Sequence, residues 1–194
     1  MTDLDAKDVL QRYLRDAREA LLWKLDGLSE YDVRRPLTPT GTNLLGLVKH
    51  VASVSAEYLG LVFDRPFPEP LPWFEEDSED NADMWATAEE SREFIVGLYE
   101  RVWKHADATI DALELEARGQ VPWWPEERRV VTLNLVLVHL IAEINRHAGH
   151  ADIVREQVDG VAGLNGRNSN LPEHDTKWWA EYRARVETAA QSVR

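Results

Sequence analysis

Four long stretches of this chain repeat apolar residues every three or four positions, which is the spacing of one face of an α-helix. The first stripe consists of Leu10, Leu14, Ala17, Leu21, Leu25 and Leu28. It predicts a helix of about seven turns. Alternation with a period of two does not continue for any length, so the pattern favours an all-α protein over a sheet protein.

Prolines, caps and glycines give the ends of the expected helices. Pro36 and Pro39 break the first helix. Thr40 or Thr42 can cap a second helix, whose apolar residues between Leu44 and Leu61 share one face. The third helix is expected at about Thr87 to Leu115, the fourth at about Thr132 to Val158 with Gly160 as its end, and a last one at about Thr176 to Ala190.

The expected architecture is a four-helix bundle over residues 4–160 with an additional short C-terminal helix over 176–190, all in one domain, 1–194. The third helix should bury the face that runs from Phe94 through Leu98 to Ile110. The C-terminal helix should bury Trp178, Tyr182, Val186 and Ala189.

The long loop between the second and third helices, residues 64–84, carries four prolines, then Trp73 and Phe74, then an acidic run at 75–80. Aromatic side chains favour burial, so the segment is expected to be an ordered loop. Long ordered loops are often lids, and we expect Trp73 or Phe74 to pack over the mouth of the bundle. The alternative is a loop that only caps the bundle end.

Charge and cysteine content exclude several functions. The chain has 22 Lys and Arg against 35 Asp and Glu, a net charge of −13, which argues against nucleic acid and anionic membranes as partners. It has no cysteine, and so no disulfide, cysteine zinc site or thiol nucleophile of its own. We expect a cytoplasmic protein, because no signal peptide or long apolar span is visible. We also expect it to act on a small-molecule substrate. Whether the chain forms a homodimer stays open.

The fourth helix places two ionisable residues within its apolar stripe. With Leu140 at zero on a helical wheel, Glu143 lies at about −60° and His147 at about −20°. Residues four apart lie one above the other on a helix, so the two side chains are neighbours. A carboxylate in an apolar stripe is costly unless it is paired or bound to a metal.

The second helix supplies a third ligand-type residue. With Leu47 at zero, His50 lies at about −60° and also points toward the interior. Two histidines and one glutamate leave a coordination position open on zinc, as catalytic zinc sites do. The same set resembles the triad of non-haem iron, so zinc, nickel or iron could occupy it.

Other assignments of these residues stay open. His139 lies one turn before Glu143 and is the alternative to His50 as a ligand. His150 lies one turn after His147, where it could act as an acid–base group beside the metal. Glu143 and His147 could also be a plain buried pair without metal.

Two motifs resemble a known family. Residues 40–50, TGTNLLGLVKH, and residues 139–152, HLIAEINRHAGHAD, resemble the ligand-bearing helices of the DinB/YfiT-like metal-binding bundles. The resemblance implies a divalent metal held by His50, Glu143 and His147. Glutamate in place of a histidine is similar to the branch with the N-terminal domain of mycothiol-dependent maleylpyruvate isomerase, whose relatives use small thiols as cosubstrates. About 35 residues follow the fourth helix, too few for the isomerase's additional domain.

The expected function is that of a transferase or isomerase that activates mycothiol or another small thiol at the metal. Arg146 and Arg155 could bind a carboxylate of the thiol, or could be surface salt bridges. His150 could take the thiol proton. The alternatives are a metal-dependent hydrolase, a non-catalytic metal- or small-molecule-binding stress protein, and a purely structural bundle.

Overall fold

The computed structural model describes residues 5–75 and 77–194, so the expected bundle start at residue 4 and Glu76 in the acidic run lie outside the described residues. The helices are α1 (Ala6–Trp23), α2 (Glu30–Arg34), α3 (Leu44–Tyr58), α4 (Arg92–Ala112), α5 (Leu133–Asp159) and α6 (Thr176–Gln191). The strands are β1 (Arg118–Gln120) and β2 (Val130–Thr132). Short 3-10 turns are η1 (Leu61–Phe63), η2 (Pro72–Phe74), η3 (Ala82–Met84) and η4 (Glu126–Arg128). The all-α prediction is confirmed.

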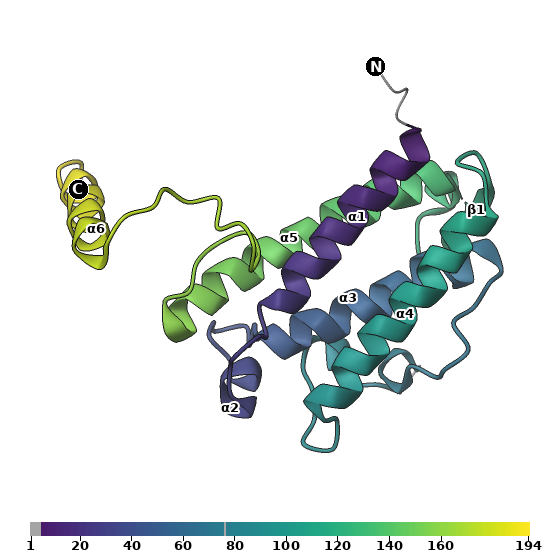
Figure 1. The fold of residues 1–194 in the computed structure, drawn as a ribbon. Helices are drawn as coiled ribbons and strands as arrows, with labels where there is room; N and C mark the ends of the chain where they lie inside the picture. Colours follow the sequence, from purple (N-terminus) through teal and green to yellow (C-terminus); the bar gives the residue numbers. More distant parts are fainter. Residues whose placement is uncertain (1–4, 76) are drawn as a thin grey trace.

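The four long helices α1, α3, α4 and α5 lie side by side (Figure 1). α1 packs mainly against α5 and α4 against α3, while α3 and α5 join the two pairs. The predicted stripes meet in one core, in which side chains from all four helices are almost fully buried: Leu14, Leu21, Leu47, Val51, Leu98, Val102, Val136, Leu140 and Ile144. None of the described helices is long and apolar enough to cross a membrane.

The end of α1 and the start of α3 differ from the expectation, whereas the end of α5 agrees with it. α1 ends after 18 residues, because the chain turns at Gly27, which has a φ of 74°. Leu25 is still buried beyond the helix end. The cap of α3 is Asn43, whose side chain accepts from Gly46 N at 2.7 Å, and not Thr40 or Thr42. The end of α5 at Gly160 is confirmed, with a φ of 77°.

The helix α4 starts later than expected, and its predicted buried face is confirmed at Leu98, Val102, Ala106 and Ile110 but not at Phe94. Ser91 caps it by accepting from Phe94 N, so the helix begins at Arg92 and not near Thr87. Phe94 itself is 45% exposed, which corrects its place in the predicted stripe. Ile95 and Tyr99 take the inward positions, because an aromatic or aliphatic residue one position along offers the same spacing.

A short hairpin links α4 to α5 and covers the end of α3. β1 and β2 pair antiparallel, with Gly119 opposite Val131. A side chain at Gly119 would lie 2.4 Å from the backbone oxygen of Val62, so only glycine lets the hairpin pack there. The hairpin turn carries Trp123 and Trp124.

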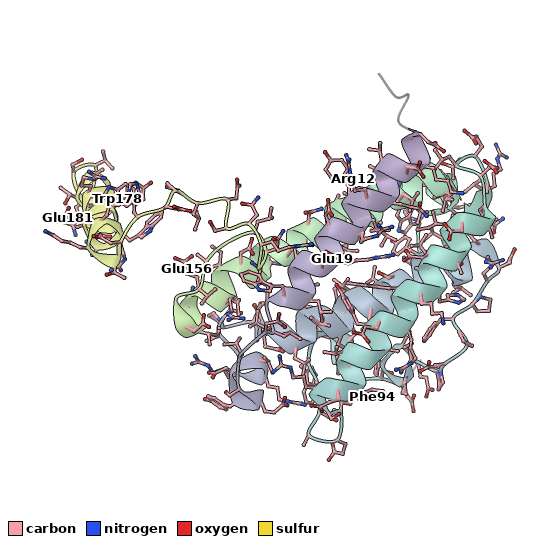
Figure 2. All side chains as sticks on the ribbon, viewed as in Figure 1. Arg12, Glu19, Phe94, Glu156, Trp178 and Glu181 are labelled. Carbon is pink, nitrogen blue, oxygen red and sulfur yellow. The ribbon has the colours of Figure 1, made fainter. Side chains whose placement is uncertain are left out.

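The C-terminal helix α6 lies apart from the bundle, at the end of the linker over residues 160–175 (Figures 1 and 2). Its existence is confirmed, but the predicted burial is wrong for the single chain, because none of the residues of α6 is buried. Tyr182 is 43% and Val186 54% exposed. Trp178, Tyr182 and His174 instead form an aromatic stack of their own.

Candidate metal centre

The adjacent helices α3 and α5 bring His50, Glu143 and His147 together. One ligand atom from each residue lies within 4.8 Å of the others. Nε2 of His147 lies 2.9 Å from Oε1 of Glu143, and Nε2 of His50 lies 3.7 Å from the same oxygen. Two imidazole nitrogens therefore lie close to one carboxylate oxygen, so a single cation could bind all three atoms.

The protonation states of this triad suit a metal. Burial raises the pKa of Glu143, but the hydrogen bond with His147 and the charges that His147 and His50 carry when protonated outweigh it, so the pKa is lowered. Burial and the charge of His50 lower the pKa of His147. At neutral pH the glutamate is therefore a carboxylate and His147 is a neutral imidazole, the forms in which both ligate metals.

The carboxylate of Asp83 holds the His50 ring from behind. Nδ1 of His50 donates to Oδ2 of Asp83 at 2.6 Å, and this fixes Nε2 as the nitrogen that faces Glu143. Burial raises the pKa of Asp83, but the hydrogen bond from His50 and the charges of His50 and Lys49 outweigh it and lower the pKa. A carboxylate behind a ligating histidine is a usual feature of metal sites. Sequence reasoning missed Asp83, since it lies on η3 within the acidic loop and no periodicity marks it.

A row of residues on α3 docks the loop that carries Asp83. Nδ2 of Asn43 donates to the backbone oxygen of Met84 at 3.1 Å, and Nζ of Lys49 donates to those of Ala82 and Trp85. Between them, a side chain at Gly46 would lie 1.8 Å from the same Met84 oxygen. The glycine in the 40–50 motif is therefore needed for the loop to reach His50.

A buried ion pair completes this docking. Nζ of Lys49 lies 2.8 Å from both carboxylate oxygens of Glu90, and the Lys49 side chain is 2% exposed. The ammonium also lies 4.1 Å from the centroid of the Trp73 ring, at the distance of a cation–π contact. The segment before α4 is thus tied to α3 on the turn next to His50.

Of the two aromatic side chains expected to cover the bundle mouth, Trp73 packs on α3 next to His50, and a cover over the candidate metal site stays a prediction. Trp73 is buried, and its Nε1 donates to Oγ of Ser53 at 2.7 Å, so it anchors the loop on α3. Phe74 is 39% exposed. The loop does reach the candidate metal site, but through Asp83.

The other end of the α3–α5 pair is aromatic and contains His139. Its ring packs against Tyr58 and Trp124, with centroids 4.8 Å and 5.4 Å away. The Tyr58 oxygen accepts from the indoles of Trp124 at 2.9 Å and Trp123 at 3.3 Å. His139 lies outside the ligand group, whose third member is His50.

The remaining predicted site residues take different places. His150 is exposed, and its ring lies 5.4 Å from that of His147. Arg146 is exposed. Arg155 is buried, and its guanidinium contacts the Asp159 carboxylate and the backbone oxygens of Lys24 and Asp26. These contacts tie α5 to the end of α1 and occupy a side chain that the sequence suggested for a cofactor.

Glu57 is a second residue that the sequence reasoning did not select. It lies seven positions after His50, within about 20° of the same face of α3. Burial, and next the negative charge of Asp83, raise the pKa of its carboxyl group. The spacing of seven from a ligand is the signal that could have found it.

Comparison with known proteins gives one family match. No curated protein matches the chain. The family model described as mycothiol-S-transferase matches residues 9–160, which include the three ligand-type residues and nearly all of the bundle but not α6. Because this match covers most of the chain and the site geometry agrees with it, the chain belongs to the mycothiol S-transferase family.

Proposed function

We propose that this chain is a metal-dependent S-transferase that joins mycothiol, or a closely related small thiol, to an electrophilic small molecule. The observation that carries the proposal is the convergence of His50, Glu143 and His147 to within 4.8 Å, in a chain that belongs to the mycothiol S-transferase family. We place the reaction in the cytoplasm, where small thiols are kept reduced.

The donor set fits a divalent cation. Two neutral imidazole nitrogens and one ionised carboxylate suit zinc, with nickel and iron as alternatives. Three protein ligands leave a position open for a substrate atom. Asp83 orients His50 at 2.6 Å, as the partners of ligating histidines do.

A bound cation would supply the charge that brings the pKa of a small thiol down toward neutral pH. The residues of the chain then carry out the rest of the reaction. His150, exposed beside His147, accepts the proton of the thiol. Arg146, also exposed on α5, binds a carboxylate of the thiol. Since Arg155 is engaged with Asp159, we give it no part in this binding.

The overall reaction with a haloalkyl substrate is simple. The sulfur forms a bond to the electrophilic carbon, the carbon–halogen bond breaks, the halide leaves, and the thiol proton passes to His150. The chain contains no cysteine, so the reacting sulfur comes from the cosubstrate and not from the protein.

The test is conjugate formation by protein that has been stripped with a chelator and reloaded with Zn²⁺, Ni²⁺ or Fe²⁺. Mycothiol and a fluorogenic haloalkyl compound should give a conjugate with at least one of these metals, and stripped protein should give none. His147→Ala should lose both bound metal and turnover, because it removes a ligand. His174→Ala, which removes a histidine of the exposed C-terminal region, is the matched control and should keep both.

The outcomes separate the candidate functions. Equal turnover with and without metal would contradict the metal requirement. Bound metal without thiol transfer, but with hydrolysis of the electrophile, would favour the hydrolase alternative. Activity with mycothiol that glutathione cannot replace would identify the thiol.

A further inference from the structure

The helix α3 meets solvent along a single strip of its surface. Twelve of its 15 residues are buried, and the other three, His50, Val54 and Glu57, are half-buried. Positions four and then three apart lie on one face of a helix, so these side chains form a continuous line. The line begins at the candidate metal site and ends beside Tyr58, the last residue of the helix. The strip is therefore an open surface that leads away from the site.

The helix α5 borders this strip with half-buried residues of its own. Oε1 of Glu143 lies 3.7 Å from Nε2 of His50, at the start of the strip. The ring of His139 lies 4.8 Å from that of Tyr58, at its far end. His139 is four residues from Glu143, and Tyr58 is eight residues from His50. At the rise of an α-helix, the far end of the strip lies roughly 6 to 12 Å from the ligand-type residues.

An aromatic cluster of Tyr58, Trp123, Trp124 and His139 closes the far end of the strip. The ring of Trp123 stands edge-on to that of Tyr58, with centroids 5.2 Å apart and an interplanar angle of 85°. Trp123 is nevertheless 44% exposed. Its indole nitrogen is held by the Tyr58 oxygen. The cluster thus presents an aromatic surface to solvent in a fixed orientation.

The hydroxyl group of Tyr58 keeps a donor that the protein does not use. Its oxygen accepts from Nε1 of Trp124 at 2.9 Å and from Nε1 of Trp123 at 3.3 Å, which occupies both lone pairs. Within residues 5–75 and 77–194, no acceptor takes the proton of this hydroxyl group. Tyr58 is only 7% exposed, and buried polar groups are normally paired. This end of the strip therefore suits a molecule that brings an oxygen acceptor.

We propose that the aromatic cluster is the subsite for the electrophile, and that the preferred electrophile is an aryl ketone with a leaving group on the neighbouring carbon. The ring stacks on Trp123, the ketone oxygen accepts from Tyr58, and the reacting carbon extends along the strip toward the thiol. The bond changes are those of the displacement described above. The proposal rests on the proposed S-transferase function for its reaction, whereas binding of the ring requires neither metal nor thiol.

The first test measures binding without chemistry. Acetylnaphthalene has the ring and the ketone oxygen but no leaving group, and ligand-observed NMR gives its affinity for the full-length protein without added thiol. Trp123→Ala should weaken this binding about tenfold, because it removes the stacking surface. Trp123→Phe, which keeps an aromatic ring, should recover most of it.

The matched control is Phe94→Ala. Phe94 is 45% exposed, close to the value for Trp123, but it lies near the start of α4, at the opposite end of that helix from the hairpin (Figures 1 and 2). This variant should bind acetylnaphthalene as the parent does. An equal loss in Phe94→Ala and Trp123→Ala would overturn the subsite, because it would show non-specific contact with exposed rings.

The second test compares two electrophiles that share one reacting group. Bromoacetyl naphthalene and bromoacetone are both bromomethyl ketones, and only the first carries the ring. With metal-loaded protein and mycothiol, the KM for the aromatic ketone should be about tenfold below that for bromoacetone. Trp123→Ala should remove this difference and leave both kcat/KM for bromoacetone and the metal content unchanged.

The outcomes distinguish the subsite from the proposed function. Ring binding that depends on Trp123, without any thiol transfer, would support the subsite and contradict the S-transferase. Thiol transfer with equal KM values for the two ketones would overturn the subsite and leave the S-transferase in place. If circular dichroism shows that Trp123→Ala has lost helix, the comparison of the two ketones with the parent protein decides.

Discussion

The bundle and the C-terminal arm show the same sequence pattern with different outcomes. Leu140 on α5 is fully buried, whereas Val186 on α6 is 54% exposed, although both lie on apolar stripes of helical spacing. In the bundle, neighbouring helices of the same chain cover the stripe. The difference teaches that periodicity shows which face of a helix requires cover, but not whether the cover belongs to the same chain.

The largest effect is expected within the bundle stripe. Leu140→Ala should lower the free energy of unfolding by about 4 kcal/mol, because it removes a fully buried side chain and leaves a cavity. Denaturant unfolding followed by circular dichroism measures this. A cost below about 1 kcal/mol would show that the bundle stripe is as loosely covered as the arm, which would break the comparison.

The second prediction tests whether the polar contacts that dock the loop on α3 stabilise the fold. Lys49→Met should lower the free energy of unfolding by about 3 kcal/mol, since it leaves the Glu90 carboxylate without its buried partner. The same unfolding experiment applies. The control is Lys177→Met on α6, whose side chain is 83% exposed, and little change is expected there. Similar costs at the two lysines would contradict the docking role of Lys49.

The third prediction separates the metal site from the fold. Asp83→Asn should weaken Zn²⁺ binding by about 10- to 100-fold, because the His50 ring loses its charged acceptor. Titration calorimetry with Zn²⁺ alone gives the affinity. Asp80→Asn changes an exposed carboxylate on the same loop and should bind as the parent does. Equal loss in both variants would indicate a general charge effect.

The smallest effect is expected in the arm. Val186→Ala should change the free energy of unfolding of the monomer by less than about 0.5 kcal/mol, because the side chain is exposed there. Denaturant unfolding followed by circular dichroism measures this. A cost near that of Leu140→Ala in the monomer would mean that α6 packs on its own bundle.

Much of the candidate metal centre was predictable, because its three ligand-type residues lie on two helices whose core faces are marked by apolar periodicity. The wheel positions of His50 and Glu143 place them on facing sides of α3 and α5. Asp83 was not predictable in this way. Its position depends on how the loop backbone settles on Asn43 and Gly46, and such long-range contacts leave no repeat in the sequence.

The fold prediction failed where the helical spacing fitted two neighbouring residues equally well, or where the surface that covers an apolar face could not be known. Phe94 and Ile95 both fit the spacing of α4, and only the packed bundle selects Ile95. The end of α1 depended on a single turn at Gly27. The sequence could not show whether the apolar stripe of α6 is buried, because a stripe does not specify the surface that covers it.

The contacts that hold the loop on α3 have a consequence for how this protein can change in evolution. Asn43, Gly46 and Lys49 meet main-chain atoms of residues 82–85, which every amino acid possesses. Ala82 and Met84 also pack against the core, so Trp85, which is 43% exposed, is the side chain of this segment that can diverge among relatives without moving the loop. Asp83 and positions 43, 46 and 49 cannot diverge in this way. A lineage could in this way change the surface beside the candidate metal site by a substitution at one exposed position, without disturbing the ligand-type residues.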